Sequence, residues 1–191
     1  MLEDLIISRV RTKILSLFFL NPDEIYHLRE IQRQTGEAMN AIRREMQHLQ
    51  QTGYASSEHR GNRKYYRMRK ENPLYYDLLG LVHKTQGLGR ALIDNRVKLG
   101  KIKFVMFSGR FVRHIKQEVN DVDVLLVGTV VLPELTQLVR VEETRRKIEI
   151  NYTVMSEAEF AFRKRRRDPF VLRVLGGSRV MIVGDEEEMV H

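Results

Sequence analysis

The chain has 191 residues, of which 42% are hydrophobic and 30% charged, and its formal net charge is +8. This composition is typical of a globular protein with one large core or two small ones, and it excludes a largely disordered chain. With no cysteine, no run long enough to span a bilayer and no signal peptide, the sequence excludes disulfide frameworks and thiolate metal sites and predicts a cytoplasmic protein with no membrane partner.

Three helices are predicted at the start of the chain, over residues 5–20, 26–36 and 37–51. In the first, apolar residues recur at the helical spacing of one buried stripe: Ile6, Val10, Ile14, Leu15, Leu17 and Phe18. In the second, Leu28 and Ile31 point inward, and Gly36 supplies the turn before the third.

The third predicted helix has two distinct faces. Its apolar face is formed by Met39, Ile42, Met46 and Leu49. Its polar face is formed by Asn40, Arg43, Arg44 and Gln47. Arg can pair with guanine, Asn or Gln with adenine, and Arg with a phosphate, so these are residue types that read base edges or hold the DNA backbone. A short helix, a Gly turn and this helix predict a helix-turn-helix with 37–51 as the recognition helix; the alternative is an ordinary solvated face.

Residues 54–70 read as two strands joined by a tight turn at Gly61-Asn62. A hairpin after a recognition helix predicts a winged helix, with the charged turn as the wing tip. Tyr65 and Tyr66 alternate across the strand, so one is expected in the core and the other toward the groove or solvent. Residues 43–70 contain eight Lys or Arg and two Glu, a net charge of +6, which indicates a localised nucleic-acid footprint. The predicted DNA contacts are Asn40, Arg43, Arg44, Gln47, His59, Arg60, Asn62, Arg63 and Lys64.

A further helix is predicted within residues 72–85, with an apolar stripe at Leu74, Leu78, Leu81 and Val82. The glycine-containing stretch QGLGR that follows it, residues 86–90, is predicted to be a hinge.

The second half begins with a predicted strand over 102–107, and another follows over 122–127. Strand alternation places Asp121 and Asp123 side by side on one face, with Val122 and Val124 on the other. Because adjacent carboxylates repel each other, such a pair usually needs a cation or a stabilising surround, and Mg²⁺ with a nucleoside triphosphate is the usual use.

A strand, a small-residue pair and then D-x-D are similar to the minimal nucleotidyltransferase domains, whose motif is Gly-Ser, D-x-D and a third carboxylate on a later strand. The resemblance implies that Ser108 and Gly109 face a triphosphate and that Asp121, Asp123 and Glu149 hold metal ions. This chain departs from that motif because the pair is Ser108-Gly109, in reversed order. In addition, only Glu149 or Asn151 can stand at the third carboxylate.

A second resemblance covers nearly the whole chain. The segments LNPDEIYHLREIQRQTGEAMNAIRREMQHLQQTG, RGNRKYY, LGKIKF, DVLLVG and EINYTVMSEAEF occur in this order. They resemble the prokaryotic regulators that fuse an ArsR-like winged helix to a nucleotidyltransferase-like domain. The resemblance implies an α+β protein: a winged helix-turn-helix over 1–86 and a small α/β domain with a mixed sheet over 87–191.

The main hypothesis is therefore a transcriptional regulator that binds double-stranded DNA. Its second domain would be an inactive nucleotidyltransferase-like fold used for dimerisation, scaffolding or sensing. A homodimer is expected because most helix-turn-helix readers use two half-sites. One alternative is an active Mg²⁺-dependent nucleotidyltransferase that modifies a partner protein, as antitoxin-like members do; another is a structural or RNA-binding module. The sequence assigns no cofactor beyond the Mg²⁺ and nucleoside triphosphate that the resemblance implies.

Overall fold

The computed structural model describes residues 2, 6–116, 118 and 121–191. It is a mixed α+β protein with one three-stranded antiparallel sheet and one four-stranded mixed sheet, which confirms the predicted fold class. The chain divides into two compact units, Met1–Thr85 and Gln86–His191. None of the helices built from the described residues combines the length and the apolar character that crossing a bilayer needs.

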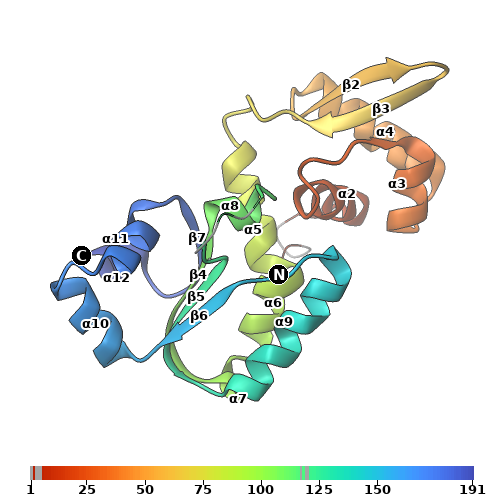
Figure 1. Cartoon of the computed structure of the whole chain (residues 1–191). Coiled ribbons are helices and arrows are strands. Elements are labelled where there is room, and N and C mark those ends of the chain that lie inside the picture. Colours follow the sequence, from red (N-terminus) through yellow and green to blue (C-terminus); the bar gives the residue numbers. More distant parts are fainter. Residues whose placement is uncertain (1, 3–5, 117, 119–120) are drawn as a thin grey trace. The chain divides into compact units, whose positions relative to one another are not determined.

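In its described residues, the first unit contains four helices and a small sheet (Figure 1). Its elements, in chain order, are α2 (Arg9–Phe19), β1 (Tyr26–His27), α3 (Leu28–Thr35), α4 (Met39–Gln51), β2 (Ala55–Arg60), β3 (Arg63–Met68) and α5 (Tyr75–Thr85). The strand order is β1-β3-β2, with both pairings antiparallel. The helices α2, α3 and α4 thus precede the β2–β3 hairpin in the chain.

Local capping explains where α2 begins and where α3 begins and ends. Ser8 caps α2, which starts after the predicted boundary; Leu5, where that prediction began, lies outside the described residues. His27 and Glu30 form a reciprocal capping box at the start of α3. Gly36 ends α3 at φ 69°, a left-handed conformation that glycine adopts without strain. The predicted turn at Gly36 is therefore confirmed.

Two predictions for the first unit need correction. The stripe of α5 is displaced along the helix: Tyr75, Leu79 and Val82 are buried, whereas Leu74 is exposed. Sequence periodicity fixes the spacing of an apolar stripe, but neighbouring elements decide its phase when several apolar residues compete. Tyr26 and His27, predicted to open the second helix, instead form the two-residue strand β1, which pairs with Tyr66 and Tyr65, and the helix begins at Leu28.

The second unit places helices on both faces of its sheet (Figure 1). Its strands are β4 (Gly100–Ser108), β5 (Val124–Val130), β6 (Tyr152–Met155) and β7 (Arg179–Val183). Its helices are α6 (Gly87–Asp94), α7 (Arg96–Leu99), α8 (Gly109–Val112), α9 (Leu132–Arg146), α10 (Glu157–Arg165), α11 (Pro169–Gly176) and α12 (Glu186–Val190). The strand order is β6-β5-β4-β7, with β5 and β6 parallel and the other pairs antiparallel.

Strand alternation gives this sheet two buried faces. One packs against α10, α11 and α12 in a core formed by Phe104, Met106, Leu125, Val127, Met155, Phe160, Val171, Met181 and Met189. Alternate residues of the same strands, such as Val105, Phe107 and Leu126, are equally buried and face the other way. In the stretch predicted as a hinge, residues 86–90, the division between the two units falls before Gln86, and α6 begins at Gly87.

Two charged segments near the end of the chain form parts of helices in the second unit. The basic run of residues 163–165 occupies the last turn of α10, where cations complement the helix dipole. The acidic end forms α12, in which Met189 is buried and Glu188 pairs with Lys103 at 2.6 Å.

Candidate functional site

Helix α4 separates apolar and polar residues as predicted. Ile42, Met46 and Leu49 are buried, and Met39 is partly covered. All four predicted contact residues of this helix are exposed: Asn40, Arg43, Arg44 and Gln47. The helix therefore presents a continuous polar surface with two guanidinium groups.

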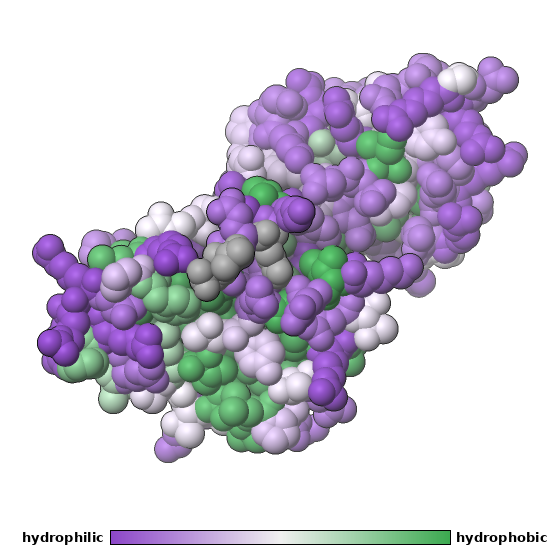
Figure 2. Space-filling view, in the orientation of Figure 1, coloured by the Kyte–Doolittle hydropathy of each residue, from purple (hydrophilic) through white to green (hydrophobic). Residues whose placement is uncertain are grey.

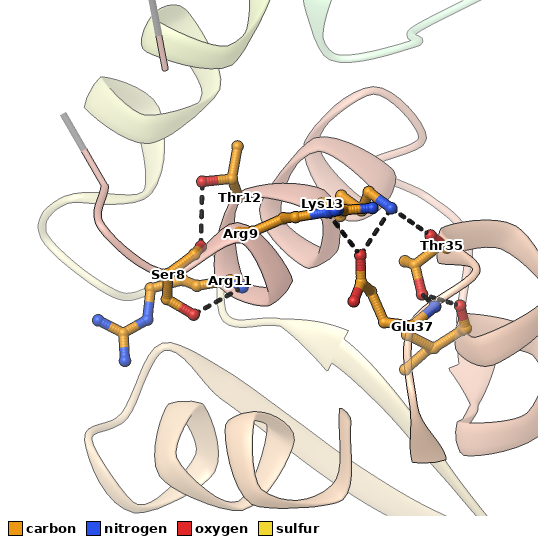
Figure 3. Close-up of polar contacts among 8 residues, drawn as sticks. Ser8, Arg9, Arg11, Thr12, Lys13, Thr35 and Glu37 are labelled. Carbon is orange, nitrogen blue, oxygen red and sulfur yellow. Dashed lines mark hydrogen bonds and ion pairs between the residues drawn. The ribbon is translucent and has the colours of Figure 1, made fainter. Parts of the chain in front are cut away.

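A polar network holds the turn before α4 against α2. Glu37 Oε1 lies 2.6 Å from Lys13 Nζ and 3.0 Å from Arg9 Nε, and Figure 3 shows both cations converging on this carboxylate. Lys13 also donates to the Thr35 carbonyl at 2.8 Å. The hydrogen bond from Lys13 and the charges of both cations lower the pKa of Glu37. The network orients the start of α4 relative to α2.

Acidic residues of the first unit engage the cations of α2 and leave those of α4 free. Arg11 Nε donates to Glu45 Oε1 at 2.6 Å, a second tie between α2 and α4. Among the described residues, Arg43 and Arg44 form no ion pair. Their charge is therefore available to an external anion.

The pairing of β2 with β3 divides the predicted wing residues between two faces. Gly61 at φ 57° and Asn62 form the predicted two-residue turn, and Arg60 pairs with Arg63 across it. His59 pairs with Lys64, and this pair lies on the face that buries Tyr66. Directly paired residues share a face, so Arg60 and Arg63 project from the opposite one.

The outer face of the hairpin carries a partly neutralised set of groups. Arg60 pairs with Glu58 at 2.6 Å and lies 5.7 Å from the ring centre of Tyr65. Tyr65 in turn contacts His27 of β1 edge to face. Tyr66 is thus the inward tyrosine of the pair and Tyr65 the outer one, as alternation predicted.

An open groove of about 510 Å³ lies between helix α4 and the inner face of the hairpin, which is the face that carries Tyr66. It is lined by Arg43, Gln47, Gln50, Gln51, Lys64 and Tyr66. Lys64 crosses it, donating to Gln50 Oε1 at 2.9 Å and lying 5.2 Å from the ring centre of Tyr66. Hydrophilic residues cover the hairpin tip in the view of Figure 2. We call this groove the interface groove.

Gln50, Gln51 and Tyr66 were missed as groove residues. Gln50 stands three residues after Gln47 and seven after Arg43, a helical spacing that could have indicated it. Tyr66 carried no such signal, because its role depends on strand register. Asn62 occupies the turn and His59 the groove side of the pleat, but neither is among the residues that line the groove.

In the second unit, the prediction that Asp121 and Asp123 share a face is wrong. Both precede β5, which begins at Val124, so strand alternation does not govern them. Asp121 and Val122 line one pocket, whereas Asp123 is 2% exposed and accepts the backbone N–H of Asn151 at 2.9 Å. The two carboxylates therefore do not converge on a common ligand position.

Arginines lie near both aspartates. Arg110 Nε is 3.0 Å from Asp121 Oδ2, and Arg110 Nη2 is 3.0 Å from Glu118 Oε1. Arg146 stacks 4.1 Å from the ring centre of Phe111 and interacts electrostatically with Asp123. Burial lowers the pKa of Arg146 to about 10, which leaves it cationic at neutral pH. Neither arginine was singled out from the sequence.

The remaining residues of the predicted nucleotide site are only partly assembled. Ser108 and Gly109 line the same pocket as Asp121. The Ser108 hydroxyl oxygen accepts the Phe111 N–H at 3.2 Å, because Ser108 caps α8. Glu149 is exposed and is not among the pocket's lining residues. The described residues contain no cluster of three groups that could hold a metal ion.

Comparison with family models, curated proteins and solved structures gives no match to this chain.

Proposed function

We propose that this protein is a transcriptional regulator that binds double-stranded DNA through its first unit. The single observation that carries the proposal is the interface groove, in which a basic helix and a basic hairpin face each other. Lys64, Arg43 and the glutamines give it the donors that hold phosphates and bases. A chain with a net charge of +8 suits a polyanionic partner.

Arg43 and Arg44 are assigned different roles in this proposal. Arg44 stands two residues from both buried Ile42 and buried Met46. Two residues correspond to about 200° around a helix, so Arg44 points almost directly away from the core. It is the arginine placed to enter a major groove and pair with a guanine.

Arg43 instead lines the interface groove with Lys64. A cation at the flank of a recognition helix, beside a wing, is placed to hold the DNA backbone. We therefore assign Arg43 and Lys64 to phosphates and Arg44 to a base, together with Asn40 and Gln47 on the exposed surface of α4.

The test is a binding measurement on duplexes selected from a random pool, followed by fluorescence anisotropy at several salt concentrations. If about five phosphates are neutralised, the logarithm of affinity should fall with the logarithm of salt at a slope of about −4 to −5. Affinity that is independent of salt, or a failure to enrich any sequence, would contradict the proposal. A palindromic selected site would support a homodimer on two half-sites.

For the second unit we propose a role in dimerisation, scaffolding or sensing rather than nucleotidyl transfer. Arg110 pairs with Asp121, and Asp123 is buried with a backbone partner. A two-metal mechanism needs carboxylates that share the metal ions. The arginine beside Asp121 and the burial of Asp123 do not favour such a mechanism.

A further inference from the structure

A pocket of about 260 Å³ opens in the second unit, between the end of β4, the start of α8 and one face of α11. It is lined by Met106, Ser108, Gly109, Arg110, Asp121, Val122, Phe170, Arg173, Val174, Gly177 and Ser178. The backbone N–H of Gly109 donates to the Ser178 carbonyl at 2.6 Å, which fixes one edge of the pocket.

The pocket's wall is largely apolar. Val122, Phe170 and Val174 pack against the core that includes Met106, but each remains only partly buried. Partly covered apolar side chains that line a concave site are the usual wall of a small-molecule pocket.

The charged groups of the pocket leave one cation in excess. Arg110 pairs with Asp121, so this carboxylate does not carry an uncompensated negative charge. Arg173 on α11 is exposed and, among the described residues, forms no ion pair. The hydroxyl of Ser178 and the guanidinium of Arg173 are thus donors available to an anionic group.

We propose that this pocket binds a small amphipathic carboxylate: an organic acid with one or two apolar rings. The apolar body contacts Phe170, Val122 and Val174, and the carboxylate pairs with Arg173. The pocket is smaller than the roughly 300–1,000 Å³ typical of sites for drug-sized ligands, which limits the body to a compact one. This ligand site goes beyond the proposed DNA binding, and the proposal of a ligand site does not depend on the proposal of DNA binding.

The same geometry disfavours a metal-bound nucleotide here. Val122, between the two aspartates, contributes an apolar side chain to the pocket, and Asp123 is not among its lining residues. Among the described residues that line the pocket, the one carboxylate that an Mg²⁺ ion would meet is Asp121, which is already paired with an arginine.

The experiment is calorimetric titration of the full-length protein, without DNA, with 1-naphthoate, neutral 1-naphthamide and Mg²⁺-ATP. We expect 1-naphthoate to bind clearly more tightly than the amide, and Mg²⁺-ATP to leave its binding unchanged. This comparison uses the unaltered protein, so it does not depend on the folding of a variant.

Arg173→Gln should weaken 1-naphthoate binding by roughly tenfold, since it removes a charge-assisted hydrogen bond. Arg165→Gln is the matched control, because Arg165 is exposed on α10 and does not line the pocket; it should bind like the unaltered protein. Equal affinity for acid and amide, equal loss in both variants, competition by Mg²⁺-ATP, or no binding at millimolar 1-naphthoate would each overturn the proposal. A separate measurement of DNA binding shows whether the proposed DNA-binding function fails together with the ligand-site proposal.

Discussion

Lys64 on the β2–β3 hairpin donates a hydrogen bond to Gln50 on α4, with 2.9 Å between Nζ and Oε1. The bond joins the hairpin to the helix and sets the position of the lysine within the interface groove. Because Gln50 is neutral, the lysine keeps its full positive charge while its flexible side chain is held in place. An ordered cation loses less conformational entropy when it meets a phosphate.

Lys64→Met should weaken binding to selected and random duplexes by similar factors and lower the salt slope by about 1, as loss of a phosphate contact does. Arg63→Met, on the outer face of the hairpin, should act in the same direction. Anisotropy titrations at several salt concentrations measure both effects. Lys98→Met removes an exposed charge from α7 and should leave affinity unchanged. A change of preferred sequence in either wing variant would mean that the wing reads bases.

Arg44→Ala should reduce discrimination between the selected duplex and a variant duplex by about 1–3 kcal/mol, the contribution of a bidentate base contact. Arg43→Ala is the matched control, because it removes the neighbouring guanidinium and should weaken both duplexes equally. Competition binding with single-base-pair variants of the selected site measures the difference. If Arg43→Ala reduced discrimination and Arg44→Ala weakened both duplexes equally, the roles assigned to the two arginines would be reversed.

The first unit should lose stability at acid pH as Glu37 becomes protonated. Its folded-state pKa is lowered by Lys13 and Arg9, so its contribution is fully present above the unfolded pKa, near 4.5, and is lost as pH falls through the folded value. Glu37→Gln should reduce the unfolding free energy at pH 7 and flatten its decline below pH 5. Urea unfolding followed by circular dichroism measures both. The exposed Glu71, in a longer 3.9 Å ion pair, supplies the control Glu71→Gln. If both variants decline with pH as the unaltered protein does, the network does not stabilise the turn.

Gly109→Ala should destabilise the second unit by about 1–3 kcal/mol, because an added Cβ overpacks a filled site. That Cβ would lie 1.9 Å from Ser178 Oγ and 2.9 Å from the Ser178 carbonyl oxygen, and the backbone cannot rotate away as the hydroxyl can. Gly176→Ala is the control, since nothing lies within 4 Å of its Cβ position. Thermal and urea unfolding of both variants compare them, and equal stability would contradict the close packing of α8 on this loop.

The purified protein should transfer no nucleotide from labelled ATP, GTP, CTP or UTP with Mg²⁺ or Mn²⁺. The physical reason is the Arg110–Asp121 ion pair, which places a fixed cation at the carboxylate that a metal would need. Label is sought on the protein, on RNA and on co-purified protein. Transfer that disappears in Asp121→Ala and Asp123→Ala would restore the enzyme hypothesis.

The features that the sequence predicted well are local. The division of α4 into buried Ile42 and Met46 and exposed Arg44 follows from helical periodicity alone. The hairpin turn follows from the conformational freedom of Gly61. Neither depends on a distant part of the chain, so a single sequence was enough.

The features that failed depend on contacts between distant residues. Asp123 accepts a hydrogen bond from the backbone N–H of Asn151, 28 residues later, and no pattern near Asp123 indicates this. The arginine beside Asp121 and the residues of α11 that complete the pocket were also missed, because they meet only when the sheet forms. Secondary-structure periodicity contains no information on such pairings.

In the two-residue turn of the β2–β3 hairpin, the number of residues matters more for the fold than their identity. Pairing continues in register from Arg60 and Arg63 to Ala55 and Met68. A single residue inserted after Asn62 would shift that register, turning Tyr66 out of the core and Tyr65 into it. The tip should therefore tolerate exchange of one side chain for another far better than insertion or deletion of a residue.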